Sequence, residues 1–177
     1  MADKEGSLAR DASRRVTLVT GASRGIGRAV ACGLAADGFD VALVYAGNAD
    51  AAADAVAACE AAGATARAYR CDVSNADEVK ATVDAVLADF GSVWALVNNA
   101  GITRDTLLAR MKDEDFARVL DVNLTGAFNM MRALTRPLMR QRGGRIVSMS
   151  SVVGLMGNAG QANYAASKAG LIGLTKS

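Results

Sequence analysis

The sequence predicts an α/β protein with a doubly wound parallel sheet that is covered by helices on both faces. Two observations carry this prediction. Short apolar segments alternate with longer segments rich in Ala, Leu and Val at helical spacing, and several short segments are continuously apolar. Continuous apolarity is typical of parallel strands buried on both sides. Alternation at this spacing indicates right-handed βαβ units, in which ligands bind at the carboxyl ends of the strands.

The elements are expected in the following order. Strands are predicted over 16–20, 40–45, 66–73, 93–98 and 145–150, and helices over 24–37, 49–62, 76–90, 112–142 (open to a break) and from 163 onward. Gly38, Gly63 and Gly91 follow the first three helices, where a left-handed cap is expected. Ser74 with Asp77 predicts a capping box at the start of the third helix.

Composition bounds the class of protein. The chain of 177 residues is long enough for one domain, expected over 16–177 after a flexible leader over 1–15. The leader has no apolar run, and no segment approaches the ~20 apolar residues of a membrane span. A net charge of +2 with mixed signs gives no electrostatic case for nucleic acid as a partner.

Cysteine and histidine usage restricts the chemistry. Three scattered cysteines form no C-x-x-C pair and the chain has no histidine, so neither a metal site nor a disulfide framework is expected. A cytoplasmic location fits these free thiols. Without histidine, acid–base chemistry must fall to Tyr, Lys, Asp or Glu.

A glycine-rich segment follows the first strand and opens the first helix. It runs through Gly21, Ser23, Arg24, Gly25, Ile26 and Gly27. Glycines allow a tight turn and close approach of backbone N–H groups to a pyrophosphate, and the helix N-terminus favours negative charge. The alternative is a glycine-rich turn without function, but the strand–loop–helix context favours a dinucleotide site.

The end of the second strand bears on which dinucleotide binds. An acid there would accept a hydrogen bond from a free ribose 2′-hydroxyl and repel a 2′-phosphate. The segment 44–49 contains no acid, and Arg24 supplies a cation for a phosphate. NADPH is therefore favoured over NADH, with a plain surface role for Arg24 as the competing interpretation.

Tyr164 and Lys168 are four residues apart, so they share one face of a predicted helix. An ammonium next to a phenol favours its ionised form, and such a phenol can pass a proton to a carbonyl oxygen while hydride reaches the carbon. The pair alone is a weak signal, because many solvated helix faces carry one.

Further polar residues are expected at the same edge of the sheet. Ser148, Ser150 and Ser151 close the fifth strand, where a hydroxyl can bind a substrate carbonyl, and residues 98–101 close the fourth. Asn123 lies in a predicted helix, where asparagine is not especially favoured, which makes it a candidate site residue. Its alternative role is a buried structural hydrogen bond.

Together these segments resemble a known family. TGASRGIG at 20–27, NNAG at 98–101, SS at 150–151 and YAASK at 164–168 are similar, in order and spacing, to the motifs of short-chain dehydrogenases/reductases with a Rossmann-type sheet. The resemblance implies Tyr164 as proton donor and Lys168 as its activator and a ribose ligand. It implies Ser151 rather than Ser150 as the carbonyl-orienting hydroxyl, and Asn123 in a water-mediated proton relay. It also implies cofactor contacts, from Asp72 and Val73 at the adenine ring, from Asn99 on the ribose side, and from Ala100 and Gly101.

Within the family, segments 101–116 and 151–177 resemble bacterial 3-oxoacyl-acyl-carrier-protein reductases of fatty-acid biosynthesis. The implied reaction is NADPH-dependent reduction of a 3-oxoacyl chain on acyl carrier protein to the (3R)-hydroxy form. Acetoacetyl-CoA or another carbonyl compound is the alternative substrate. Arg142 is a candidate contact for the acidic carrier, with an ordinary exposed arginine as the alternative.

The resemblance also implies that members of this type continue beyond the position of Ser177, with the last strands of the sheet and a substrate lid. We therefore expect an incomplete Rossmann-type domain that is inactive or very weak alone, with residues 145–150 at a sheet edge. A cofactor-binding fragment without chemistry is the second hypothesis. The family resemblance implies a homodimer or homotetramer through 112–142 and the Tyr164 helix.

Overall fold

A computed structural model describes residues 13–177, which contain one parallel sheet of five strands in the order β3-β2-β1-β4-β5. The strands are β1 (Val16–Thr20), β2 (Asp40–Tyr45), β3 (Ala66–Arg70), β4 (Ala95–Asn98) and β5 (Arg145–Ser148). Every neighbouring pair is parallel. From β1 in the middle of the sheet, the chain winds outward to β3 and returns to β4 on the other side of β1, so the strand order reverses between β1 and β4. The predicted doubly wound sheet is confirmed.

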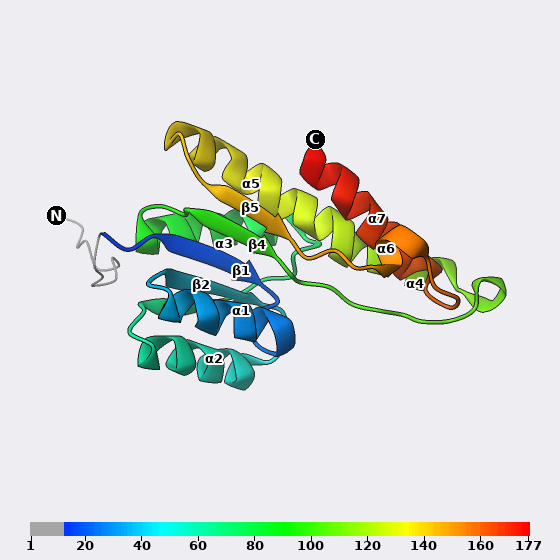
Figure 1. Ribbon diagram of the computed structural model, residues 1–177, viewed down its shortest axis with the longest axis horizontal. Helices are drawn as coiled ribbons and strands as arrows, with labels where there is room; N and C mark the ends of the chain where they lie inside the picture. The colour runs from blue at the N-terminus through cyan, green and yellow to red at the C-terminus, as the bar shows by residue number, and fades with distance from the viewer. Residues whose placement is uncertain (1–12) are drawn as a thin grey trace.

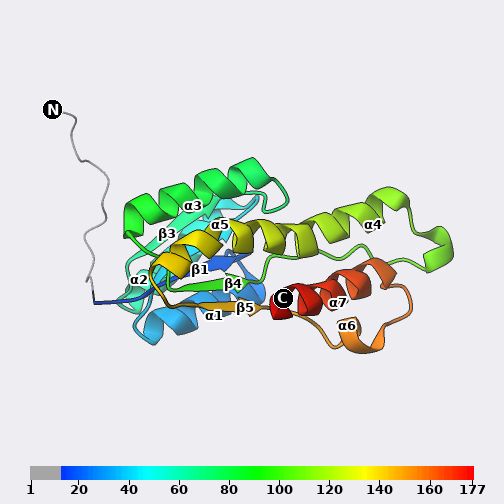
Figure 2. The same cartoon turned by 90° about the horizontal axis from the view of Figure 1, so that it is seen from above.

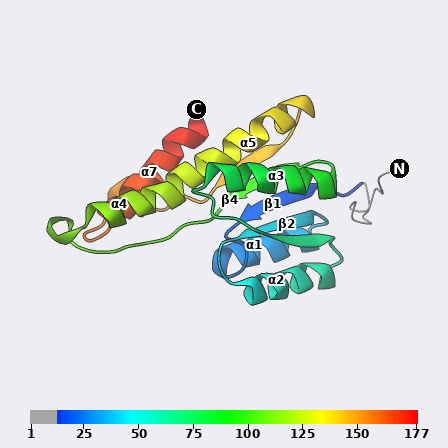
Figure 3. The same cartoon turned by 180° about the vertical axis from the view of Figure 1, so that it is seen from behind.

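Helices cover both faces of this sheet (Figures 1 and 3). One face carries α1 (Gly25–Ala36) and α2 (Ala49–Ala61), and the other carries α3 (Ala76–Phe90) and α5 (Gly126–Arg140). Figure 2 shows α4 (Asp113–Leu120) and α7 (Ala162–Lys176) side by side beyond the end of the sheet, with the short α6 (Val153–Met156) next to α7. The carboxyl ends of the strands point toward this helical region.

The core lies in two layers, one on each face of the sheet. From β1, Val16 and Leu18 pack into the layer with α3 and α5, while Val19 packs into the layer with α1 and α2. All three side chains are fully buried. Successive residues of a strand point to opposite faces, so a strand with helices on both sides is buried along its whole length, and in β1 this includes Thr17 and Thr20.

Three predicted strands are longer than the observed ones because the chain leaves the sheet early or joins it late. After β3, the N–H of Cys71 still donates to the Tyr45 carbonyl (2.8 Å), but the N–H of Asp72 donates to the Glu78 carboxylate (2.9 Å). After β5, the N–H of Ser150 turns back to the Ser148 carbonyl (3.1 Å). The predicted strand over 93–98 begins later, at Ala95.

The helix caps are partly as predicted. Gly38, Gly63 and Gly91 have φ values of 89°, 84° and 78°, which confirms the left-handed caps. The predicted capping box of Ser74 with Asp77 is wrong by one residue. Asn75 is the N-cap of α3, and its side chain accepts hydrogen bonds from the N–H groups of Asp77 (3.0 Å) and Glu78 (3.2 Å).

The stretch over 112–142 is broken, as the sequence left open. A π-helical turn, Asp121–Thr125, separates α4 from α5. Most of the predicted leader, residues 1–15, lies outside the described residues. At its end Arg14 pairs with the buried Asp40 (3.2 Å), and the Arg15 guanidinium lies 4.1 Å from the centre of the Trp94 ring. No helix in the described part has the length and apolarity needed to span a bilayer.

Candidate functional site

The glycine-rich loop between β1 and α1 requires its glycines for geometric reasons. Gly21 and Gly25 adopt φ values of 65° and 55°, in the left-handed region that favours glycine. A Cβ on Gly27 would overlap the carbonyl oxygen of Gly21 and lie 2.5 Å from the Asn99 amide nitrogen. The first turn of α1 has no acidic residue, so its free N–H groups and partial positive charge remain available to an anion.

Thr20 and Asn99 connect the loop to β4. The Thr20 hydroxyl accepts hydrogen bonds from the N–H groups of Asn99 and Ala100, each at 3.0 Å, and donates to the Val97 carbonyl (3.3 Å). The Asn99 side chain donates to the carbonyls of Thr20 (2.9 Å) and Gly21 (3.3 Å). The two strands that flank the reversal of strand order are therefore held together directly beneath the loop.

A cavity of about 580 Å³ opens at this point. All eleven residues that the sequence assigned to cofactor contacts outside the helix of Tyr164 line it: Gly21, Ser23, Arg24, Gly25, Ile26, Gly27, Asp72, Val73, Asn99, Ala100 and Gly101. A ligand cavity is expected outside the carboxyl ends of the strands at a reversal of strand order. The structure therefore brings the predicted loop, the end of β3 and the end of β4 around one space.

The end of β2 forms another part of this wall. Tyr45, Ala46, Gly47 and Asn48 line the cavity together with Arg24, and Asp72 is the only acid among all the lining residues. Asn48 caps α2 by accepting a hydrogen bond from the N–H of Ala51 (2.9 Å). The sequence has no acid at the end of β2, which favoured a 2′-phosphate. The part of the cavity wall that this segment forms therefore carries no carboxylate.

A second cavity, of about 460 Å³, adjoins the first and holds the Tyr164–Lys168 pair. Arg24, Ile26, Asn99, Gly101 and Ile102 line both cavities. A ligand held by the glycine-rich loop can therefore extend to the tyrosine without leaving the protein surface.

Lys168 is almost fully buried within α7. Its ammonium donates to the Met149 carbonyl (2.6 Å) and lies 5.7 Å from the centre of the Tyr164 ring. Burial lowers the pKa of Lys168 from its ordinary value. The ammonium therefore lies beside the aromatic ring while its hydrogen bond goes to the backbone.

The serines after β5 occupy different positions. Ser150 lines the second cavity, and its hydroxyl donates to the Lys168 carbonyl (2.9 Å). Ser151, which the resemblance implied as the orienting hydroxyl, is half-buried and accepts a hydrogen bond from the N–H of Val153 (3.3 Å). Ser151 follows the wall residue Ser150 in the chain but does not itself line the cavity, so the role of Ser151 stays a prediction.

Asn123 lies in the π-helical turn and is 1% exposed. Its amide oxygen accepts from the N–H of Ile102 (2.8 Å), and its amide nitrogen donates to the Ile102 carbonyl (3.0 Å) and the Ser167 hydroxyl (3.1 Å). These are the structural hydrogen bonds of the alternative interpretation. These bonds place Asn123 between α7 and the segment after β4. The π-turn changes the direction in which the side chains of the helix point, and this brings Asn123 to that position.

Several residues of the site were not predicted from the sequence, among them Thr20 and Arg118. Thr20 could have been found, since a hydroxyl at the last position of a buried strand faces the reversal point. Arg118 of α4 lines the first cavity and bonds Asp72, 46 residues away, and no sequence pattern indicated it. Among the described residues, no group of His, Cys, Asp and Glu is arranged to hold a metal ion.

Known proteins are similar to this chain in sequence and in fold. The chain is 54% identical over 160 residues to the 3-oxoacyl-[acyl-carrier-protein] reductase FabG of Staphylococcus aureus, a match of 90% of this chain and 65% of the relative. It is 48% identical over 163 residues to FabG of Escherichia coli, with 92% and 65% covered. The chain thus spans about two thirds of the length of these curated relatives.

One solved structure is also similar to this chain. The crystal structure of an NAD+-bound xylitol dehydrogenase superposes with a TM-score of 0.89 at 41% identity, covering 92% of this chain and 62% of the other. The family described as short chain dehydrogenase matches residues 15–177, from the start of β1 through α7. Given the glycine-rich loop, the Tyr164–Lys168 pair and these matches, the chain belongs to the short chain dehydrogenase family.

Proposed function

We propose that this chain carries the nucleotide-binding and proton-donating residues of an NADPH-dependent 3-oxoacyl-acyl-carrier-protein reductase, acting in cytoplasmic fatty-acid biosynthesis. One observation carries the proposal: the cavity at the glycine-rich loop adjoins the cavity of Tyr164 and Lys168, and the two share wall residues. The named relatives in Staphylococcus and Escherichia are reductases of 3-oxoacyl-[acyl-carrier-protein].

The residues present fit a nicotinamide dinucleotide. The absence of a Cβ on Gly27 lets the loop fold closely over the segment after β4, and the N-terminus of α1 faces the cavity with its N–H groups free for a pyrophosphate. Arg24 can pair with a 2′-phosphate, and no acid at the end of β2 opposes it. The structural neighbour is a dehydrogenase bound to NAD+, whereas these last two features are the basis for proposing NADPH here.

The chain's own side chains supply the acid–base part of the reaction. When bound, the dinucleotide supplies the hydride that reaches the carbonyl carbon. The Tyr164 hydroxyl donates its proton to the carbonyl oxygen, and the Lys168 ammonium stabilises the phenolate that remains. Ser151 donates a hydrogen bond to the same oxygen. Asn123 holds the π-turn beside Lys168 and takes part in a water-mediated proton relay to that lysine.

We further propose acyl carrier protein as the carrier of the substrate, and a homodimer or homotetramer as the assembly. Arg142 is exposed and lies before β5, at the amino ends of the strands, whereas Tyr164 lies beyond their carboxyl ends. Arg142 is therefore proposed as a contact for the carrier's acidic surface and not for the acyl chain.

The test combines nucleotide binding with turnover. NADPH fluorescence measures binding to the chain, and NADPH oxidation is followed with a 3-oxoacyl thioester on acyl carrier protein. Turnover by the unchanged chain is expected to be weak, and Tyr164→Phe should lower it by a factor of about 10² or more while NADPH binding is retained, because the proton donor is gone. Turnover that Tyr164→Phe leaves unchanged would contradict the proposed mechanism.

A cofactor-binding role without chemistry is the second candidate. The observation that favours it is the hydrogen bond from the Lys168 ammonium to the Met149 carbonyl (2.6 Å), since among the described residues this ammonium makes no hydrogen bond to the Tyr164 hydroxyl. NADPH binding without turnover on either the carrier-protein or the CoA thioester supports this candidate. Turnover on acetoacetyl-CoA alone would instead assign a different carbonyl substrate.

A further inference from the structure

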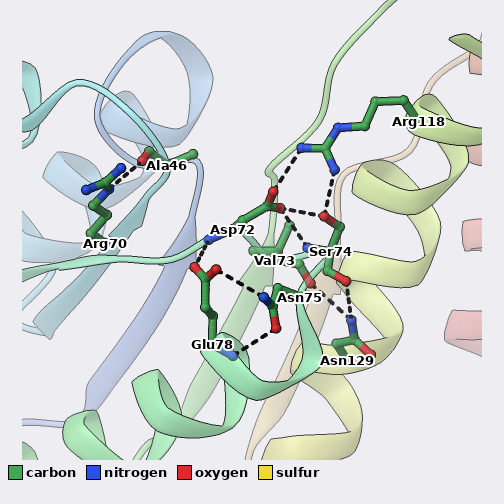
Figure 4. A network of polar contacts seen from close by, with 9 residues as sticks. All are labelled: Ala46, Arg70, Asp72, Val73, Ser74, Asn75, Glu78, Arg118 and Asn129. Carbon is green, nitrogen blue, oxygen red and sulfur yellow. Dashed lines mark hydrogen bonds and ion pairs between the residues drawn. The ribbon is translucent and has the colours of Figure 1, made fainter. Parts of the chain in front are cut away.

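A closed set of polar contacts joins the loop after β3 to α4 at the rim of the nucleotide cavity (Figure 4). The Arg118 guanidinium donates through one nitrogen to the Asp72 carboxylate (2.9 Å) and through the other to the Ser74 hydroxyl (2.8 Å). The Ser74 hydroxyl in turn donates to Asp72 (2.6 Å). Asp72 and Arg118 both line the cavity.

The acceptor positions of Asp72 can be counted. A carboxylate offers about four lone pairs, two on each oxygen. Oδ1 accepts from both the hydroxyl and the N–H of Ser74 (2.6 and 3.0 Å), which fills it. Oδ2 accepts from Arg118. One acceptor position on Oδ2 therefore remains, on a residue of the cavity wall.

The loop beneath this carboxylate is held independently of Arg118. The N–H of Asp72 donates to the Glu78 carboxylate (2.9 Å), and the Asn129 side chain of α5 donates to the Val73 carbonyl (3.1 Å). Figure 4 shows these bonds on the opposite sides of the loop. The backbone position of Asp72 thus does not depend on Arg118, whereas the rotation of its carboxylate is set jointly by Ser74 at Oδ1 and by Arg118 at Oδ2.

The ion pair itself stabilises the fold little. The side chains of Arg118 and Asp72 are 48% and 38% exposed, and exposed ion pairs contribute little to unfolding free energy. Burial raises the pKa of Asp72, but the hydrogen bonds from Ser74 and Arg118 outweigh it, and the net pKa is lowered. Asp72 is therefore a carboxylate at neutral pH, able only to accept hydrogen bonds.

We propose that Arg118 is a positioning residue for recognition of the adenine base, holding the Asp72 carboxylate so that the remaining lone pair of Oδ2 accepts a hydrogen bond from the exocyclic amino group. This inference rests on the proposed nucleotide site and adds a specificity-determining residue from α4. Because α4 also contacts α7, the residue ties the adenine end of the cavity to the helix that carries Tyr164.

The test compares NADPH with its hypoxanthine analogue, which replaces the exocyclic amino group with a carbonyl oxygen. That oxygen cannot donate to Asp72, so the unchanged chain is expected to prefer adenine by roughly tenfold or more in Kd. Arg118→Ala is expected to reduce the preference to within about threefold. Arg118→Lys should lose it as well, because one ammonium cannot bridge both acceptors as the planar fork does.

Lys80→Ala is the matched control. It removes one positive charge from an exposed ion pair with Asp84 on α3, away from the cavity lining. We expect the adenine preference of Lys80→Ala to equal that of the unchanged chain, and thermal unfolding to show that every variant is folded.

The outcomes separate this inference from the proposed function. An adenine preference that survives in Arg118→Ala overturns the inference, as does a preference lost with alanine but kept with lysine, which would show that charge alone matters. If the unchanged chain binds both nucleotides equally, the inference fails while the nucleotide site stands. If it binds neither, the proposed function itself fails.

Discussion

At the scale of single residues, the nucleotide site depends on the absence of a Cβ atom at Gly27. The space beside its Cα is occupied by the carbonyl of Gly21 and the amide of Asn99, which belong to the loop and to the segment after β4. Any larger residue must separate these two segments. Gly27 therefore determines how closely the glycine-rich loop approaches the segment after β4.

We expect Gly27→Ala to weaken NADPH binding strongly and to destabilise the fold by about 1–3 kcal/mol, since the new Cβ must displace the Gly21 backbone as well as the Asn99 side chain. Isothermal titration and urea unfolding measure the two effects. Gly33→Ala in the same helix is the control, because its Cβ meets nothing within 4 Å. It should leave binding unchanged and stabilise α1 by up to about 1 kcal/mol. Equal effects at both positions would refute the close-approach argument.

At the scale of elements, local hydrogen bonds decide where helices begin and how they bend. Asn75 starts α3 and so fixes the direction from which the Asp72–Ser74 segment approaches the cavity. The break between α4 and α5 involves a contact that is distant in sequence. Asn123 accepts a hydrogen bond from the N–H of Ile102, 21 residues away. A sequence pattern can reveal the first kind of feature more readily than the second.

Asn75→Ala is expected to lower the free energy of unfolding by about 1 kcal/mol, because two N–H groups of the first turn lose their acceptor. Asn75→Asp keeps an acceptor oxygen and should cost much less. Urea unfolding with circular dichroism provides both values. If alanine and aspartate prove equally destabilising, the cap is not what stabilises the start of α3.

At the scale of the whole molecule, the two edges of the parallel sheet carry different surfaces. The carboxyl edge holds the cavities, while the amino edge holds Arg15, Arg142 and Arg145, with the guanidinium groups of Arg15 and Arg145 near the Trp94 ring. Arg142 also adopts a φ of 54°, which is uncommon for a residue other than glycine. A partner recognised there contacts the edge of the sheet opposite to the one beyond which α7 carries Tyr164.

Charge reversal at Arg142 tests that separation. Arg142→Glu should raise KM for the carrier-protein thioester several-fold, mainly at low ionic strength, and leave KM for the CoA thioester unchanged. Steady-state kinetics at two salt concentrations give the comparison. Arg67→Glu, which alters an exposed arginine of β3, serves as the charge control. A matched rise in KM for both thioesters would contradict a carrier contact.

Much of this molecule follows from its sequence because the signals are local. The short, mostly apolar segments over 16–20 and 40–45 predicted β1 and β2 with their observed bounds, and the glycine-rich loop with Tyr164 and Lys168 predicted the residues of two adjoining cavities. The misplaced cap at Ser74 arose because neighbouring Ser and Asn are both good N-caps. Arg118 escaped prediction because its partner is distant in sequence and both residues are exposed.

The bonds between Thr20 and Asn99 have a thermodynamic consequence. They fix the floor of the cavity through contacts within the protein, so the backbone there has little conformational entropy left to lose when a ligand arrives. Binding to such a floor retains more of its interaction free energy, since the ordering cost was already met when the chain folded.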